Sequence, residues 1–346
     1  MEKPSIRRLG SKIYDAITSA MSLSQTLDES RCELPRNNPR DGETISLDAE
    51  EDSCSGCANP CSTHPNYPYL KIDRKSTLEG TVKPYVKHVL ISTGKSDWQT
   101  HIEEDTFSLA AYLHKVLKSN NSPKGNKKDS LIEKKNKVEG SPQTHEDSSN
   151  EAEKPRIVIT NSSRQNNDSD SKGNDVLLFP DNILIKNVTP KQAAEFYKRF
   201  LSTPISSLNE EKEQYLSTVN FTVEQMPYKA VIVICSHKRR DKRCGVTGPI
   251  LKEEFDRVLK EKNLDVESHN NNGIAVFLSS HTGGHKFAGN IIVYRDGQGI
   301  WYGRVIPCHV KSIVELTVLE GKVIKDLYRG SMNGSFAPGK GGKLDW

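Results

Sequence analysis

The sequence predicts an α/β fold of the α+β kind, in which a mixed β-sheet packs against helices and one run of elements occurs twice. Three observations support this. Apolar, β-branched runs of five or six residues recur along the chain, as buried strands require. Amphipathic stretches separate them, and strands that alternate with helices are typical of layered domains. The 346 residues are enough for two such domains, each with its own core.

Composition limits both the packed part of the chain and the classes of protein that fit. Only 34% of the residues are hydrophobic, so we expect a sizeable part to lie outside any core. The net charge of +4 is small and spread along the chain. This does not favour nucleic-acid binding, because such proteins concentrate Lys and Arg on one face. No apolar run approaches the length of a membrane span, so we expect a soluble protein.

The chain contains an odd number of cysteines and begins without an apolar signal segment. Disulfide frameworks belong to small secreted domains, whereas intracellular cysteines more often bind metal or take part in redox chemistry. We therefore expect an intracellular protein with reduced thiols. The seven cysteines are Cys32, Cys54, Cys57, Cys61, Cys235, Cys244 and Cys308.

Residues 1–81 are predicted to be a mostly disordered N-terminal segment. The first 31 residues are basic and contain apolar residues at helical spacing, which is consistent with a mitochondrial presequence. Glu2 and Asp15 count against it, because presequences are poor in acids. An ordinary surface helix or tail is the alternative.

The same segment contains a Cys-rich stretch, Cys54-Ser-Gly-Cys57-Ala-Asn-Pro-Cys61-Ser-Thr-His64. Three thiols and an imidazole at this spacing could close a tetrahedral zinc site. The second ligand pair that usually follows further along is absent, so a mobile thiol-bearing segment remains the alternative.

The first unit is predicted over residues 82–205. It begins with a strand at 87–92 and an amphipathic helix that opens at Asp105 and includes Phe107. Residues 119–153 are predicted to be a disordered insertion, because their polar composition cannot bury enough surface to offset chain entropy. The later elements are strands at 156–160, 176–179 and 183–185 and a helix at 189–201, whose Pro190 suits its first turn.

The second unit, residues 228–333, repeats this order, and a flexible tail follows at 334–346. Its elements are strands at 230–235, 274–279, 290–294 and 300–305, a helix from Pro249 to about Lys262 and a helix at 310–319. Strand, helix, strand, strand and helix is the order of a thioredoxin-like layer. We therefore predict tandem thioredoxin-like domains, of which only the second carries a set of ligands.

Metal-capable side chains follow two strands of the second unit. Cys235 ends the first of these strands, and a basic turn leads from it to Cys244. His281 and His285 follow the strand at 274–279, and Gly283-Gly284 between them lets the backbone fold tightly. Two thiols and two imidazoles at neighbouring strand ends could converge on one metal centre. Spacing alone leaves open that the cysteines are core residues and the histidines surface groups.

Three motifs around these residues resemble one known family. They are Cys235-Ser-His-Lys-Arg-Arg-Asp-Lys-Arg-Cys244-Gly-Val-Thr-Gly-Pro, His281-Thr-Gly-Gly-His285-Lys-Phe-Ala-Gly-Asn and Trp301-Tyr-Gly-Arg-Val. They are similar to motifs of the sucrase/ferredoxin-like family of thioredoxin-like ferredoxins, and most similar to its fungal "altered inheritance of mitochondria" members. The resemblance covers most of residues 82–333. It implies that Cys235, Cys244, His281 and His285 hold a [2Fe-2S] cluster, in a protein of electron transfer or thiol redox control and not in a hydrolase.

Imidazole ligation has consequences for the redox chemistry. Two neutral imidazoles leave the oxidised cluster formally uncharged, so we expect a higher potential than in plant-type ferredoxins. A ligating imidazole can also lose its remaining ring proton, so the potential should depend on pH. His237 imitates the Cys-x-His element of Rieske proteins, but we expect it not to be a ligand.

Two other interpretations of the same four residues remain open. A structural zinc site could use them, because two cysteines and two histidines also suit zinc. Alternatively, Cys235 and Cys244 could cycle through a disulfide in a dithiol oxidoreductase. The CxxC motif that lowers the pKa of the attacking thiol is missing, which disfavours the second alternative.

Several residues bear on partners and compartment. The basic turn, residues 238–243, is either a solvated loop or a surface that steers an acidic redox partner. Cys308 is predicted to be a core residue. The terminal Leu344-Asp345-Trp346 resembles the tag by which clients dock on the cytosolic iron-sulfur targeting complex. Because cytosolic cluster insertion conflicts with a presequence, the location, mitochondrial or cytoplasmic, stays open.

Overall fold

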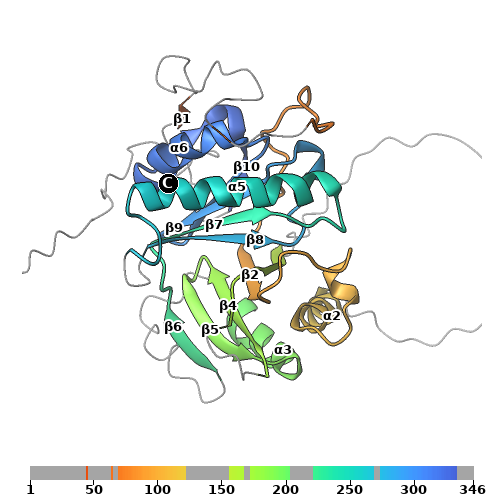
Figure 1. Ribbon diagram of the computed structural model, residues 1–346. Coiled ribbons are helices and arrows are strands. Elements are labelled where there is room, and N and C mark those ends of the chain that lie inside the picture. Colours follow the sequence, from red (N-terminus) through yellow and green to blue (C-terminus); the bar gives the residue numbers. More distant parts are fainter. Residues whose placement is uncertain are drawn as a thin grey trace, which may run out of the picture. The chain divides into compact units, whose positions relative to one another are not determined.

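Ten strands form one mixed sheet in the order β12-β10-β9-β7-β8-β3-β2-β4-β5-β6. The computed structural model describes residues 44–45, 64, 69–121, 156–166, 172–202, 221–268 and 273–332, which all belong to one compact unit, Asn37–Trp346. Helices lie against this sheet, as Figure 1 shows, which confirms the predicted α/β class. Within the described ranges, no helix is both long and apolar enough to cross a membrane.

The first half of the sheet has β2 at its centre. Its strands are β2 (Lys87–Ser92), β3 (Ile157–Ser162), β4 (Asn174–Phe179), β5 (Ile183–Val188) and β6 (Thr222–Gln225). β2 pairs parallel with β3 and antiparallel with β4, and β4 and β5 form an antiparallel hairpin. The helices of this half are η1 (Ile102–Glu104), α2 (Leu109–Asn121) and the run of η2 (Pro190–Gln192), α3 (Ala193–Phe196) and η3 (Tyr197–Leu201). These helices and one face of the strands enclose a buried apolar cluster.

The second half is built around β7. Its strands are β7 (Ala230–Cys235), β8 (Ile274–Ser279), β9 (Ile291–Arg295), β10 (Gln298–Tyr302) and β12 (Tyr328–Ser331). Its helices are α5 (Lys242–Glu261), η5 (His285–Phe287), η6 (Pro307–His309), α6 (Val310–Ser312), η7 (Ile313–Leu319) and η8 (Lys325–Leu327). A separate parallel pair joins β1 (Thr44–Ile45) to β11 (Val323–Ile324). Figure 1 shows α5 lying across β7, β8 and β9, where its apolar face closes the core of this half.

The pairing pattern of the two halves is the same. β7 pairs parallel with β8 and antiparallel with β9, and β9 pairs antiparallel with β10. In the first half, β2 pairs in the same way with β3 and β4, and β4 with β5. A single antiparallel pair, Ser162 with Ser279, joins the halves. The repeated order of elements therefore extends to strand direction. β6 lies between the predicted limits of the two units and pairs with β5 of the first half.

The strand faces that carry no helix form a third core, shared by both halves. Leu90 and Leu177 of the first half belong to the same buried cluster as Val233 and Ile292 of the second. Strands covered on both faces must be apolar on both, which explains the continuous apolar runs in the sequence.

A chain of buried polar groups crosses this shared core. Trp301 donates its indole N–H to the Tyr85 hydroxyl at 2.7 Å, and the hydroxyls of Tyr85 and Tyr294 lie 3.0 Å apart. The Tyr294 hydroxyl lies 2.6 Å from Nδ1 of His88, and Nε2 of His88 lies 2.7 Å from the Thr160 hydroxyl. All five side chains are buried. Because each polar group has a partner, the chain fixes the alignment of the two halves without unsatisfied groups.

Some predicted boundaries are wrong or lie outside the described residues. α2 begins at Leu109, because the Ser108 hydroxyl accepts the N–H of Ala111 and starts the helix there. Phe107 is therefore not part of the apolar helix face but is 85% exposed. α2 also extends to Asn121, into the predicted insertion. The rest of that insertion, the predicted presequence and the tail at 334–346 lie outside the described residues.

Candidate metal centre

Cys235 is the last residue of β7, and its side chain is completely buried. The strand forms because its residues are apolar and mostly β-branched, as suits a central strand covered on both faces. The Cys235 N–H donates to the Asn290 carbonyl at 3.0 Å, which holds the strand end beside β9. Its thiol contacts the thiol of Cys244, the side chain of His281 and the backbone N–H of Thr282. Cys235 is thus the point where the two thiols meet residues 281–285, which carry both histidines and form the histidine loop.

Cys244 lies in the first turn of α5, which corrects the prediction that the helix begins at Pro249. The helix begins at Lys242 because Asp241 is its N-cap and accepts the N–H of Arg243 at 2.9 Å. The Cys244 thiol therefore lies on a rigid helix, near the positive end of the helix dipole, and not in a flexible turn.

Two glycines bring this helix against the chain that follows Cys235. In a sequence they are read as turn residues, yet both are helical here. A Cβ atom at Gly245 would lie 2.4 Å from Cβ of Lys238, and one at Gly248 would lie 2.6 Å from Cβ of Ser236. Only glycine permits this approach. The close contact places Cys244 next to Cys235.

The two thiols share one hydrogen bond and titrate as a pair. The bond from Cys244 holds the pKa of Cys235 well below its usual range, against the opposing effect of burial. The same bond, together with burial, raises the pKa of Cys244. The metal-free pair therefore loses its first proton easily and holds the second tightly, so Cys235 is the first thiolate available to a metal.

His281 lies in the loop that follows β8, and His285 is the first residue of η5. Their ring centroids are 5.3 Å apart, and the ring planes are tilted by 41°. Gly283 and Gly284 have φ values of 96° and 69°, a left-handed conformation that turns the loop sharply between the two histidines. Nδ1 of each ring is buried and makes no hydrogen bond. Burial lowers the pKa of His285, which favours the neutral imidazole that a metal requires.

His237 has both ring nitrogens engaged elsewhere. Nδ1 accepts the backbone N–H of His281 at 3.0 Å, and Nε2 lies 3.1 Å from the Trp98 carbonyl. Its ring is buried and lies edge-on to Trp98. His237 therefore positions the histidine loop rather than offering a free nitrogen to a metal.

Replacing His237 with alanine tests this role. We expect the wavelengths of any visible absorption bands, normalised to iron, to stay unchanged, because no ligand is lost. The free energy of unfolding should fall by about 1–3 kcal/mol, because the His281 N–H loses its partner. Urea unfolding and the visible spectrum measure the two effects. A shift of the bands would instead identify His237 as a ligand.

Residues 96–101 of the first half cover the chain that follows Cys235. The Ser236 hydroxyl donates to the Ser96 carbonyl at 2.9 Å, and the Arg239 N–H donates to the Asp97 carboxylate at 3.2 Å. With the contact of His237 to Trp98, these bonds bind the first half to the ligand region of the second. The first half therefore holds in place the chain that leads from Cys235 toward Cys244.

A comparison with models of protein families shows to which family this chain belongs. Residues 78–330 match the model of the sucrase/ferredoxin-like family. The chain belongs to this family. The match spans both halves of the sheet and confirms the resemblance that the three motifs predict.

Two relatives of this chain show how far the sequence similarity extends. Altered inheritance of mitochondria protein 32 from Meyerozyma guilliermondii is 35% identical over 189 residues, which cover 52% of this chain and 64% of that protein. The protein of the same name from Clavispora lusitaniae is 41% identical over 128 residues, which cover 37% of this chain and 44% of that protein. The matches thus span less than two thirds of these relatives.

Among solved structures, the family member is similar to a thioredoxin-like [2Fe-2S] ferredoxin from Aquifex aeolicus. The identity is 22%, and the match covers 32% of this chain and 96% of that one, with a TM-score of 0.24. This likeness is too slight to assign a fold or a cofactor.

The basic turn is largely paired within the chain. Arg239 forms an ion pair with Asp97 at 3.6 Å, and Arg243 binds Asp241 through both carboxylate oxygens. Arg240 lies 2.9 Å from the His101 ring. Three of the five basic side chains therefore hold this turn in place, and a surface for an acidic partner stays a proposal.

Of the Cys-rich stretch, only His64 lies within the described residues. Its Nδ1 lies 3.4 Å from the thiol of Cys308, and its Nε2 lies 3.6 Å from Glu254 on α5. Cys308 is buried, as predicted for a core residue. Among all residues that the structure describes, no three His, Cys, Asp or Glu side chains form a site for a single metal ion.

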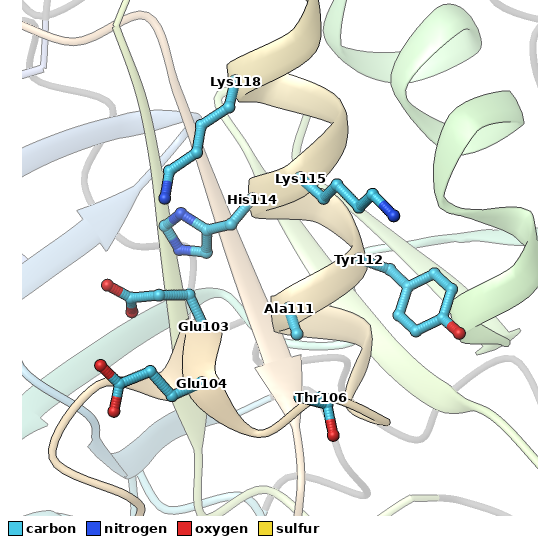
Figure 2. Close-up of a pocket in the computed structure, with 8 residues that line it drawn as sticks. All are labelled: Glu103, Glu104, Thr106, Ala111, Tyr112, His114, Lys115 and Lys118. Carbon is cyan, nitrogen blue, oxygen red and sulfur yellow. The ribbon is translucent and has the colours of Figure 1, made fainter.

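A surface cleft of about 610 Å³ lies along η1 and α2 of the first half. Figure 2 shows the His114 ring between Lys118 and Glu103 at one side of it. Burial lowers the pKa of His114. None of the four predicted ligands lines this cleft, so it is separate from the candidate metal centre.

Proposed function

We propose that this protein holds a [2Fe-2S] cluster through Cys235, Cys244, His281 and His285 and acts in electron transfer or thiol redox control. The observation that carries the proposal is the pair of imidazoles beside the thiol pair, each with a buried Nδ1 that lacks a hydrogen bond. Buried polar atoms without partners are rare, because an unpaired buried nitrogen costs free energy. A metal bound by each ring would give these nitrogens a partner. When bound, such a cluster would take up and release a single electron.

The donor set fits a two-iron cluster. Thiolates are the usual ligands of iron-sulfur clusters, and histidines replace two of them in Rieske centres. Because the sulfides of such a cluster supply the other ligands of each iron, the protein needs to supply only two ligands per iron. The contacts supply two such pairs, thiol with thiol and ring with ring.

The chain's own groups are arranged to stabilise negative charge on sulfur. The Thr282 N–H contacts the Cys235 thiol and lowers its pKa, and Cys244 lies near the start of a 20-residue helix. Both thiols are fully buried, and residues 96–101 close over the adjacent chain. These groups hold thiolates in a site from which water is excluded.

We propose that each half of the sheet is one thioredoxin-like unit, at 82–205 and 228–333. The repeated strand directions and the single joining pair support this. In this proposal the first unit has no ligands and serves to cover the second. Where β7 and β8 end with Cys235 and Ser279, β2 and β3 end with Ser92 and Ser162, so a serine stands in the first half at the position of Cys235.

Partners and location follow from the same proposal. An electron carrier needs a redox partner protein, and the names of the relatives favour a mitochondrial role. Leu344, Asp345 and Trp346 lie outside the described residues, so docking on the cytosolic iron-sulfur targeting complex rests on their sequence alone.

Anaerobic purification followed by iron, sulfide and zinc analysis tests the proposal. We expect a red-brown protein with about two irons and two acid-labile sulfides per chain. A colourless protein with zinc would support the structural Cys2His2 site instead. A metal-free protein that reduces the disulfides of insulin would support the dithiol oxidoreductase.

A further inference from the structure

Arg329, on β12, is a fully enclosed cation, with only 1% of its surface exposed. Nη1 donates to the Asn290 side-chain oxygen at 2.8 Å and to the Gly283 carbonyl at 3.3 Å, and Nε donates to the Thr81 hydroxyl at 3.1 Å. The guanidinium also lies over the ring of Phe287, 5.2 Å from its centroid. Arg329 is thus held by the histidine loop and by the elements beside it.

Its partners in the described part of the chain are all uncharged. No carboxylate there lies within ion-pair distance of Arg329, whereas the other buried arginine, Arg164, pairs with Asp175 at 2.9 Å. Burying a cation is costly unless a negative charge compensates it. The position of Arg329 therefore implies a negative charge nearby that is not a carboxylate of these residues.

The candidate metal centre supplies that charge. Burial lowers the pKa of Arg329, and negative charge on Cys235 and Cys244 opposes this effect, which leaves the pKa at about 10. The fit to the histidine loop is close, because a Cβ atom at Gly284 would lie 2.1 Å from Nη2 of Arg329. Arg329 therefore lies against the loop between His281 and His285 and acts electrostatically on the thiols.

The charge of a [2Fe-2S] cluster with these ligands gives this cation a role. Two ferric ions, two sulfides, two thiolates and two neutral imidazoles sum to zero, and one electron from an external donor brings the sum to −1. No bond forms or breaks. A buried positive charge favours the reduced form, and the low dielectric of the site strengthens the effect.

We propose that Arg329 is a positioning residue that balances the charge of the reduced cluster and raises its reduction potential. This inference rests on the proposed function. Arg329 need not touch the cluster, because charge acts over distance and its hydrogen bonds fix where the charge lies.

A dithionite titration of the intact protein, followed by visible absorption, tests the inference. In Arg329→Gln we expect the ratio of reduced to oxidised protein at a fixed potential to fall about tenfold, which is 59 mV for one electron. Arg329→Lys keeps the charge and should restore most of the difference. Arg304→Gln is a matched control. Arg304 also lies 5.2 Å from the Phe287 ring centroid, but it has Asp73 at 3.9 Å as a partner.

A second pair of variants keeps Arg329 in place, in case Arg329→Gln does not fold. Thr81 is exposed and already accepts from Nε of Arg329. Thr81→Asp offers the guanidinium a carboxylate and should lower the potential, whereas Thr81→Asn has the same shape without the charge. Equal potentials for Thr81→Asp and Thr81→Asn, or for Arg329→Gln and the wild type, would overturn the inference. A wild-type protein without iron and sulfide would instead overturn the proposed function.

Discussion

Replacing Cys235 with serine is expected to abolish cluster binding. Cys235 contacts Cys244, His281 and the Thr282 N–H, so its thiol joins the other cysteine to the chain that carries the histidines. Loss of a residue that only supports a ligand typically costs 10- to 100-fold in metal affinity, so loss of a ligand should cost at least about 100-fold. Iron and sulfide content after anaerobic reconstitution measures the effect.

The control for this experiment is Cys308→Ser. Cys308 is also a buried thiol, but it contacts His64, which is not one of the four candidate ligands. The Cys308→Ser protein should keep the wild-type iron content. Circular dichroism of both variants separates loss of ligation from loss of folding. A folded Cys235→Ser protein with full iron and sulfide would rule out Cys235 as a ligand.

Acidification is expected to destabilise the protein through His88. Burial, and secondarily the charge of Arg156, lowers the pKa of His88 from 6.5 to about 3. Between these two values the unfolded chain binds a proton that the folded chain does not, so the free energy of unfolding falls as the pH falls. The stabilisation is complete above pH 6.5 and declines by about 1.4 kcal/mol per pH unit as the pH falls toward 3, roughly 5 kcal/mol in total.

Urea unfolding at a series of pH values from 7 to 4 measures this decline. Other groups also titrate in the window, so the test is the difference between the wild type and His88→Gln, whose amide does not titrate. The difference in free energy of unfolding should narrow with acidification. His101→Gln is the control, because the His101 side chain is 42% exposed. Parallel curves for the wild type and His88→Gln would contradict the prediction.

The strands were predictable because each is encoded by its own residues. Ala230–Cys235 and Ile274–Ser279 are apolar runs that form strands with the predicted limits. The start of α5 was not predictable in this way. Gly245 and Gly248 favour a turn when read locally, and their helical conformation depends on contact with Lys238 and Ser236. Tertiary packing overrides the local preference at this point.

The candidate site shows the same division. The spacing of Cys235, Cys244, His281 and His285, with the flanking motifs, was enough to predict four candidate ligands, which stay a proposal. The groups that tune and cover them leave no such pattern. His237 bonds to the Trp98 carbonyl 139 positions earlier in the chain, and Arg329 bonds to Asn290 39 positions earlier.

By itself, the sequence determined the α/β class, the strands and the family, because short apolar runs and spaced motifs are local properties of the chain. Only the tertiary structure decided that Cys244 lies on a helix, that His237 is engaged and that Arg329 lies buried against Gly283 and Asn290 without a carboxylate partner among the described residues. These facts depend on which distant segments meet. Such meetings are set by the packing of the whole chain, and no local pattern of residues records them.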